Sequence, residues 1–217
     1  MAGCCHDDHC TEADARRGDP AFKRVLWIVL AINAAMFVVE IVGGLATGSA
    51  SLQADALDFL GDTGNYAISL FVVGMVLRYR SMAALAKGGT MGLFGLWVMA
   101  TVVWHLYAGT VPEPLTMGAV GVAALIANAV CFALLYAYRA GDANMRSVWV
   151  CSRNDVLGNI AVLLAALGVF GTGRGWPDLV VATVMALLAL QGAVVVVRHA
   201  LEELSSVPPN IATVGND

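Results

Sequence analysis

Charge is scarce in this chain. Charged residues make up only 13% of its 217 residues, whereas hydrophobic residues make up 59%. A water-soluble domain of this size needs far more charge to cover its surface. We therefore predict a protein that crosses a membrane several times, with the lipid bilayer as a partner. Neither enzymatic activity nor a nucleic-acid partner is expected.

A disulfide framework is missing as well. Of the five cysteines, three lie within the first ten residues, and Cys131 and Cys151 lie in apolar segments. This distribution indicates reduced thiols in or facing a cytoplasm. A cleaved leader is not expected either. Arg16 and Arg17 precede an apolar run, but that run (residues 25–46) has 22 residues, too many for the apolar core of a signal peptide.

Long polar stretches are absent between residues 23 and 198. Each apolar segment in this region can cross a hydrocarbon layer of ~30 Å as a helix, which takes about 20 residues. The segments are 24–46, 51–77, 83–107, 115–138, 145–170 and 177–197. We predict an all-α membrane protein in which residues 23–198 form six transmembrane helices. Residues 1–22 are expected to be a mobile cytoplasmic tail, and residues 199–217 a short cytoplasmic one.

The basic residues are distributed unevenly between the two ends of these segments. Ten of the twelve Lys and Arg residues fall on the side that carries both termini, Arg174 falls on the other side, and Arg153 lies inside the fifth segment. Cytoplasmic loops carry an excess of Lys and Arg. Both termini are therefore expected in the cytoplasm.

Acidic side chains inside the second segment are the strongest functional signal. In the stretch SASLQADALDFLGDTGNY, Asp55, Asp58, Asp62 and Asn65 fall within about 80° of one another on a helix. Carboxylates within a membrane are energetically unfavourable, and they mark ion pathways or binding sites. Hydrogen bonding between helices would explain one such residue, but it does not explain three on one face.

A metal site is the function that these residues predict. Asp58 and Asp62 are four residues apart, as are Cys151 and Asp155 of the fifth segment, so each pair shares a helix face. Two such pairs offer the four ligands of a tetrahedral Zn²⁺ site. The thiolate favours Zn²⁺ and Cd²⁺ over harder ions. Without metal, the carboxylates repel one another and are expected to hold protons, which metal binding would release.

Several further polar residues are candidates for supporting roles. Asp55 lies one turn before Asp58 and could be a further ligand, a proton carrier or the partner of Arg153. Asn65 and Asn159 are expected to donate hydrogen bonds around the metal ligands, and Glu40 to line a water path. The N-terminus is either a soft-metal capture site or a flexible polar tail. The residues that would bind the metal are Cys4, Cys5, His6, His9 and Cys10.

These motifs resemble those of the cation diffusion facilitators, which export divalent metal ions in exchange for protons. The second helix of that family carries an [H/D]-x-x-x-D pair after a T-G-S approach, which matches Asp58 and Asp62 after Thr47-Gly48-Ser49. The pair of the fifth helix matches Cys151 and Asp155, with Cys151 standing where zinc exporters usually have His or Asp. The resemblance implies a homodimer. Most members also have a cytoplasmic C-terminal domain, so the chain is expected to be a short member without one.

The resulting hypothesis is an antiporter that exports Zn²⁺, and also Cd²⁺, across a bacterial inner membrane by alternating access, without a cofactor. An intramembrane aspartyl hydrolase would also use paired aspartates, but its G-x-G-D signature is replaced by Phe59-Leu60-Gly61-Asp62. A membrane metal sensor or binding protein that does not transport stays open as a third interpretation.

Overall fold

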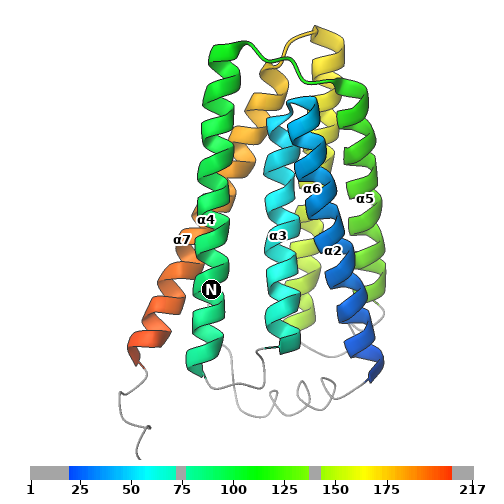
Figure 1. Cartoon of the computed structure of the whole chain (residues 1–217). Coiled ribbons are helices and arrows are strands. Elements are labelled where there is room, and N and C mark those ends of the chain that lie inside the picture. The colour runs from blue at the N-terminus through cyan, green and yellow to red at the C-terminus, as the bar shows by residue number, and fades with distance from the viewer. Residues whose placement is uncertain (1–19, 72–76, 137–142, 207–217) are drawn as a thin grey trace, which may run out of the picture.

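The described residues form six helices and no strand. The computed structural model describes residues 20–71, 77–136 and 143–206 (Figure 1). The helices are α2 (Pro20–Thr47), α3 (Ala50–Phe71), α4 (Leu77–Ala108), α5 (Pro114–Tyr136), α6 (Ala143–Thr172) and α7 (Trp176–Ser206). The prediction of an all-α protein with six helices is confirmed.

Five of these helices are long and apolar enough to cross a membrane. The remaining one, α3, carries Asp55, Asp58 and Asp62. It packs against all five of the others, so its acidic face is shielded by protein rather than by lipid. The protein is therefore a multi-pass membrane protein with a polar helix at its centre. The cytoplasmic location of the termini stays a prediction.

Two helices extend beyond the apolar segments that predicted them. The third apolar segment begins at residue 83, but α4 begins at Leu77; the sixth ends at residue 197, but α7 continues to Ser206. Apolar composition marks only the part of a helix that fits the hydrocarbon layer, whereas backbone hydrogen bonding continues into the polar interface. The expected link of Thr47, Gly48 and Ser49 is confirmed, because α2 ends at Thr47 and α3 begins at Ala50.

The three described links meet at one end of the bundle. Gly48 has φ 69°, a left-handed conformation that favours glycine where a helix ends. At Gly175, a Cβ would lie 2.2 Å from the carbonyl oxygen of Thr110, so only glycine permits this approach. Glu113 connects the links, since its N–H donates to the oxygen of Thr47 at 3.1 Å. Its carboxylate accepts from Thr116 and Leu115, which holds the pKa of Glu113 below its ordinary value.

The N-terminus of α3 is capped by a side chain from another helix. Asp178, in the first turn of α7, is fully buried. Its carboxylate accepts from Ser49 Oγ at 2.7 Å, from the N–H of Ala50 at 2.8 Å and from the N–H of Ser51 at 3.1 Å. The first N–H groups of a helix have no partner within it, and they favour a negative charge nearby. Asp178 therefore holds the start of α3 against α7.

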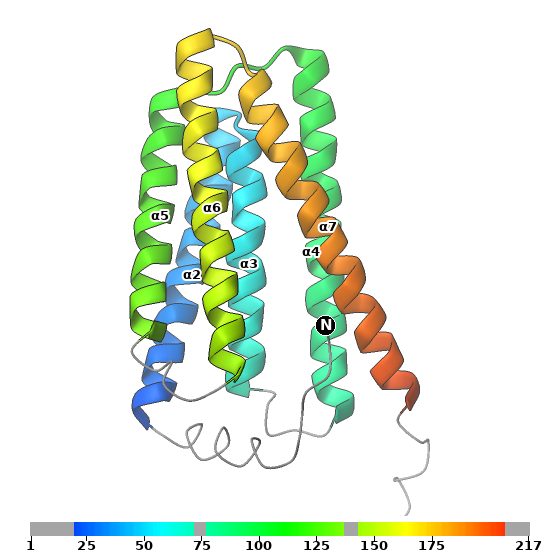
Figure 2. The same cartoon turned by 180° about the vertical axis from the view of Figure 1, so that it is seen from behind.

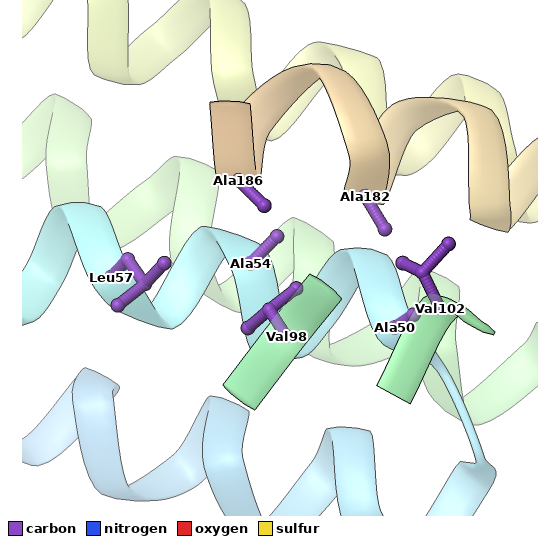
Figure 3. Packing of buried hydrophobic residues seen from close by; sticks show 7 residues of the cluster. All are labelled: Ala50, Ala54, Leu57, Val98, Val102, Ala182 and Ala186. Atoms are coloured by element: carbon purple, nitrogen blue, oxygen red, sulfur yellow. The ribbon is translucent and has the colours of Figure 1, made fainter. Parts of the chain in front are cut away.

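Small side chains bring α3, α4 and α7 together near this end (Figure 3). The buried cluster contains Ala50, Ala54, Leu57, Val98, Val102, Ala182 and Ala186. Alanine permits close approach of helices inside a membrane. In Figures 1 and 2, α4 and α7 lie side by side, and α7 leans away from α3 towards its C-terminal end. The contact of α3 with α7 is therefore closest in the half of the bundle that holds the described links, whereas α4 stays beside α3 along its length, with Met91 against Gly61 and Lys87 against Gly64.

Candidate metal-binding site

The three acidic residues of α3 lie near the middle of that helix. At a rise of 1.5 Å per residue, Asp58 lies ~12 Å and Asp62 ~18 Å from Ala50, in a helix of ~33 Å. Asp55 is fully buried, whereas Asp58 and Asp62 are half-buried. The side chains with metal-binding chemistry thus lie at the depth expected of a midplane site.

A glycine of α6 brings the second helix of the predicted site against these carboxylates. A Cβ at Gly158 would lie 3.4 Å from Asp55 Oδ1 and 3.4 Å from Asp58 Oδ2. Met185 of α7 approaches the same point, with its Cε at 3.3 Å. Two carboxylates of α3 therefore lie in van der Waals range of the Cβ position of Gly158 on α6.

Asp155 lies on α6, about one turn before Gly158. Since the Asp58 carboxylate lies against the Gly158 position, the contact of α3 and α6 brings Asp58 and Asp155 to the same part of the bundle. As they stand, no three His, Cys, Asp or Glu side chains of the described residues are arranged to hold a metal ion.

The fourth predicted ligand, Cys151, is on α6, but its side chain is outside the described part of the structure, as is that of Arg153. The helical backbone places Cys151 one turn before Asp155. The predicted capture residues of the N-terminal tail also lie outside the described residues; these are Cys4, Cys5, His6, His9 and Cys10.

Glu40 and Asp55 form a pair of buried carboxyl groups beside the site. Glu40, on α2, is 0% exposed and Asp55 is 1% exposed. None of the four oxygens of these two side chains has a hydrogen-bond partner among the described residues. Buried carboxyl groups without partners are energetically costly inside a membrane, and such residues are typical of functional sites.

The two predicted amide donors lie in different surroundings. Asn159 is fully buried, but its amide donates to the main-chain oxygen of Asp155 at 2.8 Å, rather than to a carboxylate. Asn65 lies on the exposed side of α3, and its Oδ1 accepts from Lys87 Nζ. In the described part of the chain, each of the two amides is thus engaged by a group other than a carboxylate of the predicted site.

Lys87 is a residue of this site that sequence reasoning missed. It lies on α4, and its Nζ donates to Asn65 Oδ1. Its aliphatic part also covers Gly64, with Cγ 3.1 Å from the position of a Cβ there. In the sequence, Lys87 is only one of the basic residues that indicate the orientation. Its spacing does not mark it, because its place beside Asn65 follows from the packing of α4 against α3.

Comparison with known proteins identifies the family. Residues 26–205 match the cation efflux transmembrane domain. The chain belongs to the cation efflux family. This confirms the resemblance drawn from the paired motifs. Since the family is one of transporters, it also favours transport over the aspartyl hydrolase interpretation.

Similar proteins from this family have names that refer to metal cations or to particular metals. The metal cation efflux system protein CzcD of Cupriavidus metallidurans is 27% identical over 202 residues, which cover 87% of this chain and 64% of CzcD. The zinc transporter ZitB of Escherichia coli is 27% identical over 199 residues, covering 84% and 62%. The cadmium, cobalt and zinc/H(+)-K(+) antiporter of Bacillus subtilis is 23% identical over 210 residues, covering 88% and 66%. The chain thus spans less than two thirds of the length of the first two.

Proposed function

We propose that this protein is an antiporter of the bacterial inner membrane that exports Zn²⁺ and Cd²⁺ from the cytoplasm in exchange for protons. The observation that carries the proposal is the approach of the Asp58 carboxylate to Gly158 of α6, the helix that also bears Asp155. It supports one ion between α3 and α6 in a chain of the cation efflux family. The names of the relatives, which include zinc transporters and an antiporter, agree with this choice.

The donor set explains the choice of ions. Asp58, Asp62 and Asp155 would supply oxygen, and Cys151 would supply sulfur. Four ligands match tetrahedral Zn²⁺, and a thiolate adds affinity for Cd²⁺, whereas Mg²⁺ and Ca²⁺ need more oxygen ligands. The ion is transported and must be released again. A ligand set dominated by carboxylates suits such reversible binding.

Replacing Cys151 by serine tests the sulfur ligand. We expect Cd²⁺ uptake to fall at least about tenfold more than Zn²⁺ uptake, because a hydroxyl is a harder ligand than a thiolate. The measurement is the ratio of initial Cd²⁺ and Zn²⁺ uptake rates in proteoliposomes. Cys131→Ser is the matched control, since Cys131 is a buried thiol of α5 whose sulfur accepts from Asn33 at 3.6 Å. Equal losses for both ions in Cys151→Ser would remove Cys151 from the ligand set.

Glu40 and Asp55 are suited to carry the exchanged protons. Both carboxyl groups are buried, and Asp55 Oδ1 lies against Gly158 beside Asp58 Oδ2. A proton released when metal binds Asp58 would therefore have acceptors next to the site that are not themselves ligands.

The Glu40→Gln variant is expected to bind Zn²⁺ as the wild type does, but to lose at least about tenfold in uptake driven by a pH gradient, because an amide cannot exchange a proton at neutral pH. Binding is measured by calorimetry in detergent, and uptake in proteoliposomes. Glu113→Gln, in the exposed link before α5, is the matched control. Normal coupling in Glu40→Gln would exclude Glu40 from the proton route.

Alternating access would come from movement of the α4–α7 pair against the other four helices. The two helices pack closely: at Gly88, a Cβ would lie 2.9 Å from Val197 Cγ2, and Ser81 Oγ donates to Glu203 at 2.6 Å. Such a pair can tilt as one unit about the alanine-rich contact with α3 (Figure 3). The lipid-facing surfaces would hold two copies together as a homodimer.

The deciding experiment is uptake into proteoliposomes that contain a Zn²⁺-sensitive dye. An outwardly directed proton gradient should drive Zn²⁺ and Cd²⁺ inwards, and collapsing that gradient with a protonophore should stop the uptake. A protein that binds Zn²⁺ in detergent but never moves it would instead be the non-transporting sensor.

A further inference from the structure

Two contacts determine how α2 lies along α5, its neighbour in Figure 1. In the half of the bundle that holds the described links, a Cβ at Gly43 would lie 3.2 Å from Val120 Cγ2. In the other half, Asn33 Nδ2 donates to Cys131 Sγ at 3.6 Å. The two helices therefore run antiparallel, and these contacts mark the two ends of one shared interval.

Polar side chains from both helices are buried in this interval. Glu40 lies one turn from Gly43 on α2, and Asn128 lies one turn from Cys131 on α5. Glu40 and Asn33 are seven residues apart, so they share a face of α2 and are separated by ~10.5 Å along the helix. The exposed fractions are 0% for Glu40, 1% for Asn33 and 6% for Asn128. These groups therefore face protein rather than lipid.

The packing of α3 against α2 brings Asp55 to the same depth as Glu40. The Cβ position of Gly43 also lies 3.8 Å from Leu52 Cδ1, which aligns the two helices at that point. Asp55 lies one turn beyond Leu52 on α3, and Glu40 lies one turn before Gly43 on α2, both in the direction away from the described links. Because Asp55 Oδ1 also lies against Gly158, the buried polar interval reaches the edge of the candidate site.

The amide of Asn33 is held with its oxygen left over as an acceptor. Its Nδ2 group donates to the main-chain oxygen of Val29 at 2.8 Å as well as to Cys131. Asn33 Oδ1 and the carboxyl oxygens of Glu40 and Asp55 have no hydrogen-bond partner among the described residues. In proteins, buried polar groups of this kind are satisfied by water, and a buried water needs about two to four polar partners. This interval supplies such partners from three helices.

We propose that α2, α3 and α5 enclose a chain of water molecules that carries protons to and from Glu40, with Asn33 and Asn128 as the positioning residues that hold this water. The inference rests on the proposed function, in which Glu40 exchanges protons. At about 2.8 Å for each hydrogen bond, about three water molecules span the ~10.5 Å between the levels of Asn33 and Glu40. Each water accepts one proton and donates another, so a proton that enters the chain at one end releases one at the other.

Apolar side chains close this chain beyond Asn33. The buried cluster around Asn33 and Cys131 includes Leu26, Val29 and Leu135, which lie towards the end of the bundle opposite the described links. An antiporter needs such a seal, because an open chain of water would let protons cross the membrane without metal. The cluster therefore has to part before the water chain can exchange protons with that side.

The Asn33→Leu and Asn128→Leu variants replace an amide by an apolar side chain of similar size. In each, kcat for Zn²⁺ uptake driven by a pH gradient should fall about tenfold or more, since positioned proton transfer contributes about 10²–10⁴ to a rate. The Zn²⁺ Kd should stay that of the wild type, because neither residue is a proposed ligand. The release of protons after mixing with Zn²⁺, followed by stopped flow with a pH-sensitive dye, should slow by a similar factor. Asn33→Ser keeps a group that binds water and should restore part of the rate.

Calorimetry in detergent, stopped flow and uptake kinetics, all on the full chain, test this inference. Gln191→Leu, which removes an exposed amide of α7, is the matched control and should change none of the three measurements. Slower proton release with an unchanged Kd in either leucine variant supports the inference, and Asn128→Leu serves if Asn33→Leu does not fold.

Two results would overturn the inference alone. One is a wild type that exchanges Zn²⁺ for protons while the folded leucine variants do so at the same rate. The other is a weakened Kd in the leucine variants, which would attribute their slower uptake to the metal ligands rather than to proton transfer. If the wild type moves no Zn²⁺, or if Glu40→Gln couples normally, the proposed role of Glu40 fails first and this inference fails with it.

Discussion

Asp62→Ala and Asp155→Ala should each reduce Zn²⁺ uptake by more than about 100-fold, since losing even an outer-shell partner of a metal ligand costs about 10–100-fold. The two residues lie on different helices, α3 and α6. Each variant would leave only three of the four proposed ligands. Initial rates of pH-driven uptake in proteoliposomes provide the measurement, with Kd from calorimetry on the same preparations.

The control for these variants is Glu202→Gln, which removes an exposed carboxylate from the C-terminal part of α7 and should leave uptake unchanged. Combining the two alanine substitutions should lower uptake no further than either one alone, because ligands of one ion act as a unit. Uptake that persists in both single variants would show that the ion does not bind between α3 and α6, and the proposed site would have to be abandoned.

Asp178→Ala should destabilise the protein by about 3–5 kcal/mol, because it removes the acceptor of several buried hydrogen bonds and leaves their donors without a partner. The lost bonds are those from Ser49 Oγ and from the N–H groups of Ala50 and Ser51. Asn at this position retains one acceptor oxygen and should lose less. The measurement is the free energy of unfolding in detergent, followed by circular dichroism.

Glu113→Ala is the appropriate comparison, because Glu113 caps the helix that directly follows it, α5, and does so at an exposed position. Loss of such a cap is expected to destabilise the protein less than loss of the buried Asp178 carboxylate. The difference between the two variants would measure what burial adds to a helix cap. If Asp178→Ala unfolded like the wild type, α3 would not depend on α7 for its start, and its position would have to come from the alanine contacts alone.

The composition and periodicity of the sequence were enough to predict the class of protein and the two residue pairs of a candidate site. Little charge and repeated apolar segments predicted a six-helix membrane protein, and this is confirmed. The four-residue spacings placed Asp58 with Asp62, and Cys151 with Asp155, because a helix brings such residues to one face whatever surrounds it. The same stretches carried the resemblance to the family. Helix ends were less accurate, since α4 and α7 continue past their apolar parts.

Only the tertiary structure shows which residues of α4 and α6 lie against the polar part of α3. Gly158 looks like any small residue of a membrane helix until its position beside Asp55 and Asp58 is known. Lys87 resembles a charge at the membrane interface, yet it lies against Gly64 and holds Asn65. The reason is physical: periodicity is a property of one helix, whereas the register between two helices depends on how their side chains fill the space between them. Residues 22 positions apart, such as Asn65 and Lys87, therefore become partners only when the bundle is assembled.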